Sequence, residues 1–152
     1  MPIRSIIFVC LGNICRSPLA LGIARKICQD HALKLKLDSA GTGAWHIGEP
    51  PCEGSILIAQ KRGIDLSAHR ARKIEGKDTE DFDLIVAMDS RNLDDLKALG
   101  FPEEKLLLLG DFAHEGADVP DPYHFRGEEG FIKVFEMIHE GVLALFKHYK
   151  II

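Results

Sequence analysis

The sequence has no apolar run as long as the roughly 20 residues that a membrane-spanning helix needs. The apolar run at residues 6–11 is also too short for the core of a signal peptide, and no small-residue cleavage site follows it. Basic residues are not in excess, because 19 Lys and Arg stand against 23 Asp and Glu, for a net charge of -4. Nucleic acids and anionic membranes bind a basic face, so neither is an expected partner.

Cysteine is scarce, with four residues in a chain of 152: Cys10, Cys15, Cys28 and Cys52. This number is too small for a disulfide scaffold in a chain of this length. No two of them form the C-x-x-C pair of zinc and thioredoxin-type sites, and the histidines show no ligand spacing. We therefore expect reduced thiols, a cytoplasmic location, no metal and no other cofactor.

The chain alternates short apolar strands with helical segments. Strands are predicted at Ser5–Cys10, 33–37, 83–88 and 106–109, and helices from Ser17 onward and at 55–62, 90–99 and 128–147. The alternation predicts one α/β domain over residues 1–152 with a parallel sheet. Ligands of such sheets bind outside the carboxyl ends of the strands, so the turn after the first strand is the first candidate site.

Three segments carry more specific patterns. Ser17 and Pro18 are typical of a helix start, with Ser17 as the N-terminal cap and Pro18 at the first helical position. The alternation of leucine and lysine at 33–37 indicates a strand with one wet face at a sheet edge. The two long loops, 40–54 and 110–127, are of the length that often carries function in a compact domain.

The turn from Cys10 to Ser17 has the composition of an anion-binding loop. Five residues separate Cys10 from Arg16, which is enough to wrap several backbone N–H groups around one centre at a helix N-terminus. Gly12 permits close backbone approach, and Asn13 tolerates a left-handed conformation. The planar fork of Arg16 can bind two oxygens of one phosphate.

In such a loop Cys10 is a candidate nucleophile, because the helix N-terminus and Arg16 favour a thiolate. The Ser17 hydroxyl is placed to stabilise that sulfur when it becomes the leaving group. A phenolate leaving a phosphate ester needs a proton, and Asp121, which precedes Pro122 in the second long loop, is the candidate general acid. Trp45 and Tyr123 are candidates to wall the slot and stack on a substrate ring.

The segment VCLGNICRSP, followed far downstream by DPY, closely resembles the low-molecular-weight protein tyrosine phosphatases. The resemblance extends over the whole chain through DSAGTGAW, AHRAR and MDSRNL. It implies four parallel strands with helices on both faces, the phosphate-binding loop between the first strand and the first helix, no metal, and a phosphocysteine intermediate. It also implies a supporting hydrogen-bond network formed by Asn13, Ser17, Ser39 and His69.

The resemblance further implies hydrolysis of a phosphotyrosyl protein or a small aryl phosphate by a monomeric enzyme, with inhibition by phosphate-like anions. Substrate binding then falls to Leu11, Gly12, Asn13, Ile14, Cys15, Ser17, Trp45 and Tyr123, and catalysis to Cys10, Arg16 and Asp121. Two departures, PPCEGS in place of an Asp-Pro-Arg stretch and His124 in place of a second aromatic, lie near the expected slot mouth. They bear on substrate preference and not on the chemistry.

Three other functions are compatible with this kind of loop. An arsenate reductase needs two further cysteines downstream, whereas none follows Cys52. Protein-arginine phosphatases resemble this loop but carry Thr where this chain has Ile14. A non-catalytic phosphate-binding module would lack the nucleophile or the acid, and both are present.

The other cysteines allow less specific interpretations. Cys15 is either a packed thiol or the partner of Cys10 in a reversible disulfide. Cys28 lies beside a helical apolar stripe and is expected in the core. Cys52 is expected to be an exposed, incidental thiol in a loop.

Overall fold

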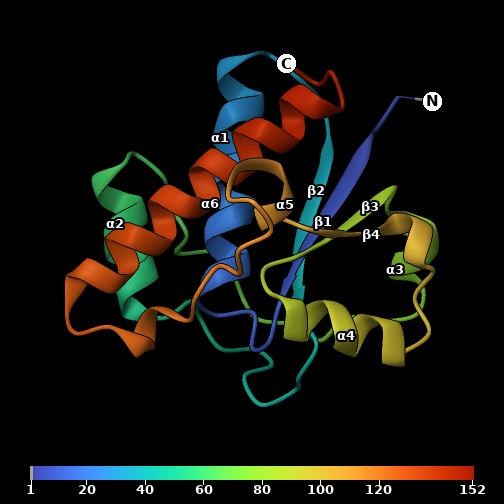
Figure 1. Cartoon of the computed structure of the whole chain (residues 1–152). Coiled ribbons are helices and arrows are strands. Elements are labelled where there is room, and N and C mark those ends of the chain that lie inside the picture. Colours follow the sequence, from blue (N-terminus) through green and yellow to red (C-terminus); the bar gives the residue numbers. More distant parts are fainter. Residues whose placement is uncertain (1) are drawn as a thin grey trace.

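A computed structural model describes residues 2–152 of the chain. A parallel sheet of strand order β2-β1-β3-β4 lies at its centre (Figure 1). The strands are β1 (Ser5–Cys10), β2 (Lys36–Gly41), β3 (Leu84–Ala87) and β4 (Leu106–Leu108). The predicted α/β class, the four strands and their parallel direction are confirmed.

Helices cover both faces of this sheet, as predicted (Figure 1). The helices are α1 (Arg16–Asp30), α2 (Glu53–Lys61), α3 (Asp78–Asp81), α4 (Ser90–Ala98), α5 (Gly110–Ala113) and α6 (Glu128–His148), with short 3-10 turns η1 (Glu103–Lys105) and η2 (Pro122–His124). Helices α1, α2 and α6 pack on one face, and α4 packs on the other. Within residues 2–152 no helix has both the length and the apolarity needed to span a membrane.

Strand β1 is apolar throughout because it has a helical layer on each side. Ile6 and Phe8 belong to the core shared with α1 and α6, whereas Ile7 and Val9 belong to the core shared with α4. All of its residues are buried. Its last residue, Cys10, therefore leaves the sheet from a fully packed strand, which fixes the start of the loop between β1 and α1.

The second strand lies at the sheet edge, but the predicted position was wrong. The leucines at 33 and 35 lie in the connection before β2, where they pack partly buried against the core. The strand itself begins at Lys36 and runs through Asp-Ser-Ala-Gly, a stretch of low β propensity. Pairing along the whole of β1, from Ser5 opposite Lys36 to Cys10 opposite Gly41, overrides that propensity.

The start of the first helix also differs from the prediction. Helix α1 begins at Arg16 with Cys15 at its N-cap, so Ser17 and Pro18 lie inside the first turn. Proline is tolerated there because first-turn N–H groups have no intrahelical partner. The Ser17 side chain does not cap the helix, and it points instead to the loop that precedes it.

Candidate active site

The Cys10 sulfur lies at the base of the loop between β1 and α1, and this residue is only 2% exposed. The backbone N–H groups of Asn13 and Ser17 donate to Sγ at 3.3 and 3.5 Å. The Ser17 hydroxyl lies 3.0 Å from the same sulfur. These three groups therefore converge on the sulfur beside the N-terminus of α1.

Asn13 holds the loop in its shape from the inside. Its φ of 57° is left-handed, a conformation that asparagine tolerates better than most residues. The fully buried side chain donates from Nδ2 to the hydroxyls of Ser17 at 2.8 Å and Ser39 at 2.9 Å. Its Oδ1 accepts the backbone N–H of Arg72 at 3.0 Å. One amide group thus links the loop to α1, to β2 and to the segment after α2.

Two glycines permit close packing around the loop. Gly41 ends β2, where an added Cβ would lie 2.7 Å from the carbonyl oxygen of Leu11. Gly12 faces His46, and a Cβ there would lie 2.9 Å from the imidazole Cδ2. Sequence analysis predicted close approach at Gly12 but missed Gly41, which ends the edge strand β2 and fell in the predicted loop 40–54.

The side chain of His69 supports the loop by a hydrogen bond to the main chain of the loop. Its Nε2 lies 3.2 Å from the carbonyl oxygen of Asn13 and donates to it, since a carbonyl can only accept. Burial lowers the pKa of His69 below its ordinary value of 6.5. The neutral ring therefore supplies one fixed N–H donor to the loop at neutral pH.

The lowered pKa of His69 predicts a pH dependence of stability. As the pH is lowered below 6.5, the unfolded chain binds a proton at His69 before the folded chain does. The free energy of unfolding therefore decreases as the pH is lowered, until the pH reaches the lowered pKa of the folded chain. We expect His69→Gln, which keeps an N–H donor, to remove this part of the slope. Urea unfolding of both proteins across this pH range checks it, and parallel slopes would contradict it.

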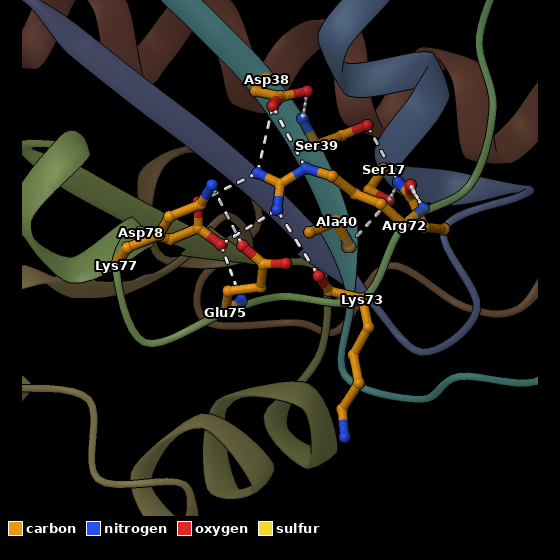
Figure 2. Close-up of polar contacts among 10 residues, drawn as sticks. Ser17, Asp38, Ser39, Ala40, Arg72, Lys73, Glu75, Lys77 and Asp78 are labelled. Carbon is orange, nitrogen blue, oxygen red and sulfur yellow. Dashed lines mark hydrogen bonds and ion pairs between the residues drawn. The ribbon is translucent and has the colours of Figure 1, made fainter. Parts of the chain in front are cut away.

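A charged cluster behind the loop fixes the segment that carries Arg72 (Figure 2). The Arg72 guanidinium bonds both carboxylate oxygens of Asp78 at 3.0 and 3.1 Å and Oδ2 of Asp38 at 3.1 and 3.2 Å. The Asp78 side chain is 2% exposed. Burial acts to lower the pKa of Arg72, but these carboxylates outweigh it and raise that pKa. Sequence analysis quoted AHRAR only as part of a resemblance and assigned Arg72 no role.

We expect Arg72→Met to lower the free energy of unfolding by about 2 to 4 kcal/mol, because it leaves the buried Asp78 carboxylate without its cation. The matched control is Lys77→Ala, which removes an exposed pair with Glu75 in the same segment. That change costs less than about 1 kcal/mol. Equal effects of the two substitutions in urea unfolding would contradict the structural role of Arg72.

Arg16 is buried, and its side chain is positioned by contacts distant in sequence. Its Nη1 donates to Oδ2 of Asp89 at 2.5 Å and to the carbonyl oxygen of Val119 at 3.0 Å. Burial acts to lower the pKa of Arg16, but the nearby Cys10 and the Asp89 carboxylate outweigh it and raise that pKa. The guanidinium is thereby a permanent cation, held in place beside Cys10.

Asp89 is a functional residue that sequence analysis missed. It lies two residues beyond the end of β3 and caps α4, where its Oδ1 accepts the N–H of Asn92 at 2.7 Å. Its other oxygen orients Arg16. An Asp at the carboxyl end of a parallel strand was an available signal, because that edge of the sheet carries the site.

A cleft of about 160 Å³ opens above the Cys10 sulfur. It is lined by Cys10, Leu11, Gly12, Ile14, Cys15, Arg16, Trp45, His46, Asp121 and Tyr123. Of the predicted binding residues, Asn13 and Ser17 lie behind this lining, buried and in contact with the loop. His46 is an addition to the predicted set. A larger cleft of about 420 Å³ beside α1 includes His69 but does not include Cys10.

The two long loops supply the walls of the cleft. Trp45 and Tyr123 are 73% and 63% exposed and stand at its rim. The Tyr123 ring packs edge to face on Phe131 of α6 with centroids 5.6 Å apart. Oδ1 of Asp121 accepts the N–H of Tyr123 at 3.0 Å, which fixes the carboxylate at the start of η2. The cleft thus joins a thiol, a guanidinium and a carboxylate.

The comparisons with known proteins agree with this geometry. Residues 5–151 match the family model described as low molecular weight phosphotyrosine protein phosphatase. Low molecular weight protein-tyrosine-phosphatase YfkJ of Bacillus subtilis is 41% identical over 152 residues, which cover 96% of this chain and 97% of YfkJ. Low molecular weight protein-tyrosine-phosphatase PtpA of Staphylococcus aureus is 44% identical over 135 residues, which cover 86% of this chain and 84% of PtpA.

Solved structures of phosphatases also superpose closely on this chain. The crystal structure of YfkJ superposes with a TM-score of 0.90 at 38% identity and covers 99% of this chain and 96% of that one. The structure of DARP, a drosophila arginine phosphatase, superposes with a TM-score of 0.88 at 33% identity and covers 95% of this chain and 97% of that one. The fold is therefore shared by phosphatases named for two different phosphoamino acids.

Proposed function

The chain belongs to the low molecular weight phosphotyrosine protein phosphatase family and is a protein-tyrosine-phosphatase, and from this premise we propose the part that each site residue takes in catalysis. The observation that carries the assignment is the single cleft in which Cys10, Arg16 and Asp121 meet. Within the proposal Cys10 is the nucleophile, Arg16 binds the phosphate and Asp121 is the general acid and base. The family domain is taken to span residues 1–152.

The first step is phosphate capture. The backbone N–H groups of the loop and the N-terminus of α1 form a site for the phosphate oxygens. Arg16, held by Asp89, adds a planar fork that matches two oxygens at once. This arrangement also predicts that phosphate-like anions compete with substrate, because they meet the same donors.

The second step is transfer of the phosphoryl group to sulfur. The Cys10 thiolate attacks phosphorus, the bond from phosphorus to the phenolic oxygen breaks, and Asp121 gives its proton to that oxygen. Tyrosine leaves and a phosphocysteine remains. Developing charge on the equatorial oxygens is met by the loop N–H groups and Arg16.

The third step is hydrolysis of the phosphocysteine. Asp121, now ionised, takes a proton from water while the water oxygen attacks phosphorus. The bond from phosphorus to sulfur breaks, and the Cys10 thiolate leaves. The Ser17 hydroxyl, 3.0 Å from Sγ, stabilises that leaving group, and inorganic phosphate departs.

The walls of the cleft support an aryl phosphate as substrate. Cys10 lies buried on the floor and Trp45 and Tyr123 stand exposed at the rim, so a phosphate on a flat ring reaches the sulfur while the ring lies between aromatic side chains. We propose phosphotyrosyl protein or a small aryl phosphate as the substrate and a monomer as the active form. The four free thiols support a cytoplasmic location.

Protein-arginine phosphatase activity is the second candidate, favoured by the similarity to DARP. Ile14 lines the cleft and offers only hydrocarbon to the substrate, which favours an aryl ester over a polar phosphoramidate. We expect phosphate release from a phosphotyrosyl peptide in excess chelator, and at least about tenfold lower kcat/KM on phosphoserine and phosphoarginine peptides of the same sequence. A higher kcat/KM on phosphoarginine would overturn the tyrosine assignment, and no release from any peptide would overturn the enzyme.

A further inference from the structure

Three of the four cysteines gather at one place in the fold. Cys10 and Cys15 both line the cleft, and Cys52 precedes α2 beside it. The expectation of an exposed, incidental thiol at Cys52 is wrong, because this residue is 8% exposed. Cys28 lies apart from them in the core, where it was expected. The proposed mechanism uses Cys10 alone, so the pair of Cys15 and Cys52 has no assigned role.

Backbone contacts hold Cys52 against the phosphate-binding loop. Its N–H donates to the carbonyl oxygen of Ile14 at 2.8 Å, which places it beside the Ile14–Cys15 peptide unit. The Ser55 hydroxyl donates to the carbonyl oxygen of Cys15 at 2.9 Å and lies 3.1 Å from the Cys52 sulfur. Ser55 thus contacts both the main chain of Cys15 and the sulfur of Cys52. This proximity is the first condition for a disulfide.

The two thiols are chemically unequal. Cys52 occupies the N-cap of the nine-residue helix α2, where the helix N-terminus favours a thiolate. The thiol of Cys15 lowers the pKa of Cys52, and contact with Cys52 together with burial raises the pKa of Cys15. Cys52 is therefore the member of the pair suited to attack as a thiolate, and Cys15 is the member that keeps its proton.

A small oxidant in the cleft meets one member of this pair and lies next to the other. Cys15 is part of the cleft lining, and Cys52 lies directly behind it, with its N–H bonded to the carbonyl oxygen of Ile14 in the same lining. Hydrogen peroxide is little larger than water, which needs only about 10 to 15 Å³ of cavity volume, and the cleft offers about 160 Å³.

We propose that Cys15 and Cys52 form a second redox site, at which hydrogen peroxide converts the two thiols into a disulfide without the participation of Cys10. The Cys52 thiolate attacks one peroxide oxygen, the O–O bond breaks, and the released hydroxide takes a proton to become water. The Cys15 sulfur then attacks the Cys52 sulfenic acid, the S–O bond breaks, and the hydroxyl leaves with the Cys15 proton as a second water. The pair loses two electrons and the peroxide gains them.

Tryptic peptides distinguish this disulfide from its alternatives. Cys10 and Cys15 share the peptide 5–16, Cys28 lies in 27–34 and Cys52 in 37–61. A bond between Cys10 and Cys15 stays within one peptide, whereas a bond between Cys15 and Cys52 joins two. The assignment therefore needs only mass spectrometry of an unreduced digest.

The test uses the reduced Cys10→Ser chain, which removes the nucleophile and makes the outcome independent of the proposed catalysis. After peroxide treatment and alkylation we expect the loss of two thiols per chain, a linked species of peptides 5–16 and 37–61, and an alkylated Cys28. Dithiothreitol restores both thiols. Adding Cys52→Ser to this chain abolishes the linked species, whereas adding Cys28→Ala leaves it intact.

Other outcomes overturn the proposal. Recovery of Cys15 and Cys52 as alkylated thiols, or as unlinked sulfinic acids, shows that the pair does not form a disulfide. Wild-type protein treated in the same way must also yield the joined peptides. If it yields only the disulfide within peptide 5–16, Cys15 pairs with Cys10 and the second redox site does not exist.

Discussion

Replacement of Cys10 by serine is expected to lower kcat on a phosphotyrosyl peptide by at least about four orders of magnitude. A serine hydroxyl keeps the volume and the contact with Ser17, but it is a far poorer nucleophile than a thiolate. The phosphate site of loop N–H groups and Arg16 stays intact. The dissociation constant of phosphate, measured by direct binding, is therefore expected to change only a few-fold. Stopped-flow or discontinuous phosphate assays give kcat.

The matched control for this substitution is Cys28→Ala, a buried cysteine of α1 that lies outside the cleft. It retains turnover. Residual activity above about one per cent of wild type in Cys10→Ser, with no contaminating phosphatase, would show that another group attacks phosphorus. Loss of phosphate binding together with turnover would indicate that the loop had collapsed, and the variant would then say nothing about the nucleophile.

The second large effect is expected for Asp121→Asn. The amide keeps an oxygen that accepts the N–H of Tyr123, so the start of η2 is preserved, but it cannot donate the proton that the leaving phenolate needs. We expect kcat on phosphotyrosine to fall by about 10²- to 10⁴-fold. The loss is expected to shrink for aryl phosphates with strongly electron-withdrawing rings, because their phenolates leave without a proton.

The control is Asp118→Asn, which makes the same change of charge in the same loop. Asp118 is bonded to the N–H and hydroxyl of Ser90 at 2.9 and 2.7 Å and does not line the cleft. It is expected to keep most of its activity. An Asp121→Asn loss that is the same for every leaving group would contradict a role in proton donation.

Local sequence patterns predicted those parts of the fold that are set by local burial. The continuous apolar run of β1 has the predicted bounds, Ser5–Cys10, because both faces of that strand are covered. The strand β2 was placed too early, because leucine alternation before it is stronger than the pattern of the strand itself. Helix α3 and the turn η2 are too short to show a period of 3.6 residues.

The loop of the site was predictable because its residues are contiguous, from Cys10 to Ser17. The support around it was not, because it comes from distant segments. Asp89 meets Arg16 across 73 positions, and Arg72 meets Asp38 across 34. Neither contact leaves a local pattern in the sequence. The same holds for Cys15 and Cys52, whose proximity depends on how the loop before α2 folds back on the phosphate-binding loop.

These contacts also indicate why the loop is rigid before substrate arrives. Asn13 is bonded to Ser17, Ser39 and the main chain of Arg72, and Arg72 is itself bonded to two carboxylates. Donors fixed in this way need no reorganisation as charge develops on the phosphate, which is the main source of electrostatic stabilisation of a transition state. The loop is thus tied to β2, α1 and α3 by side chains that do not line the cleft.

The central claim is that the phosphoryl group passes through the Cys10 sulfur. In the most direct test, Asp121→Asn protein is mixed with an aryl phosphate that has an activated leaving group, and the reaction is quenched during turnover. The mass of the tryptic peptide 5–16 is then measured by mass spectrometry. With that substrate the phosphocysteine forms with little help from a general acid. Its hydrolysis has lost the general base, so the phosphocysteine accumulates. We predict that the peptide gains the mass of one phosphoryl group, located on Cys10. An unmodified peptide while phosphate is still being released would show that water attacks phosphorus directly.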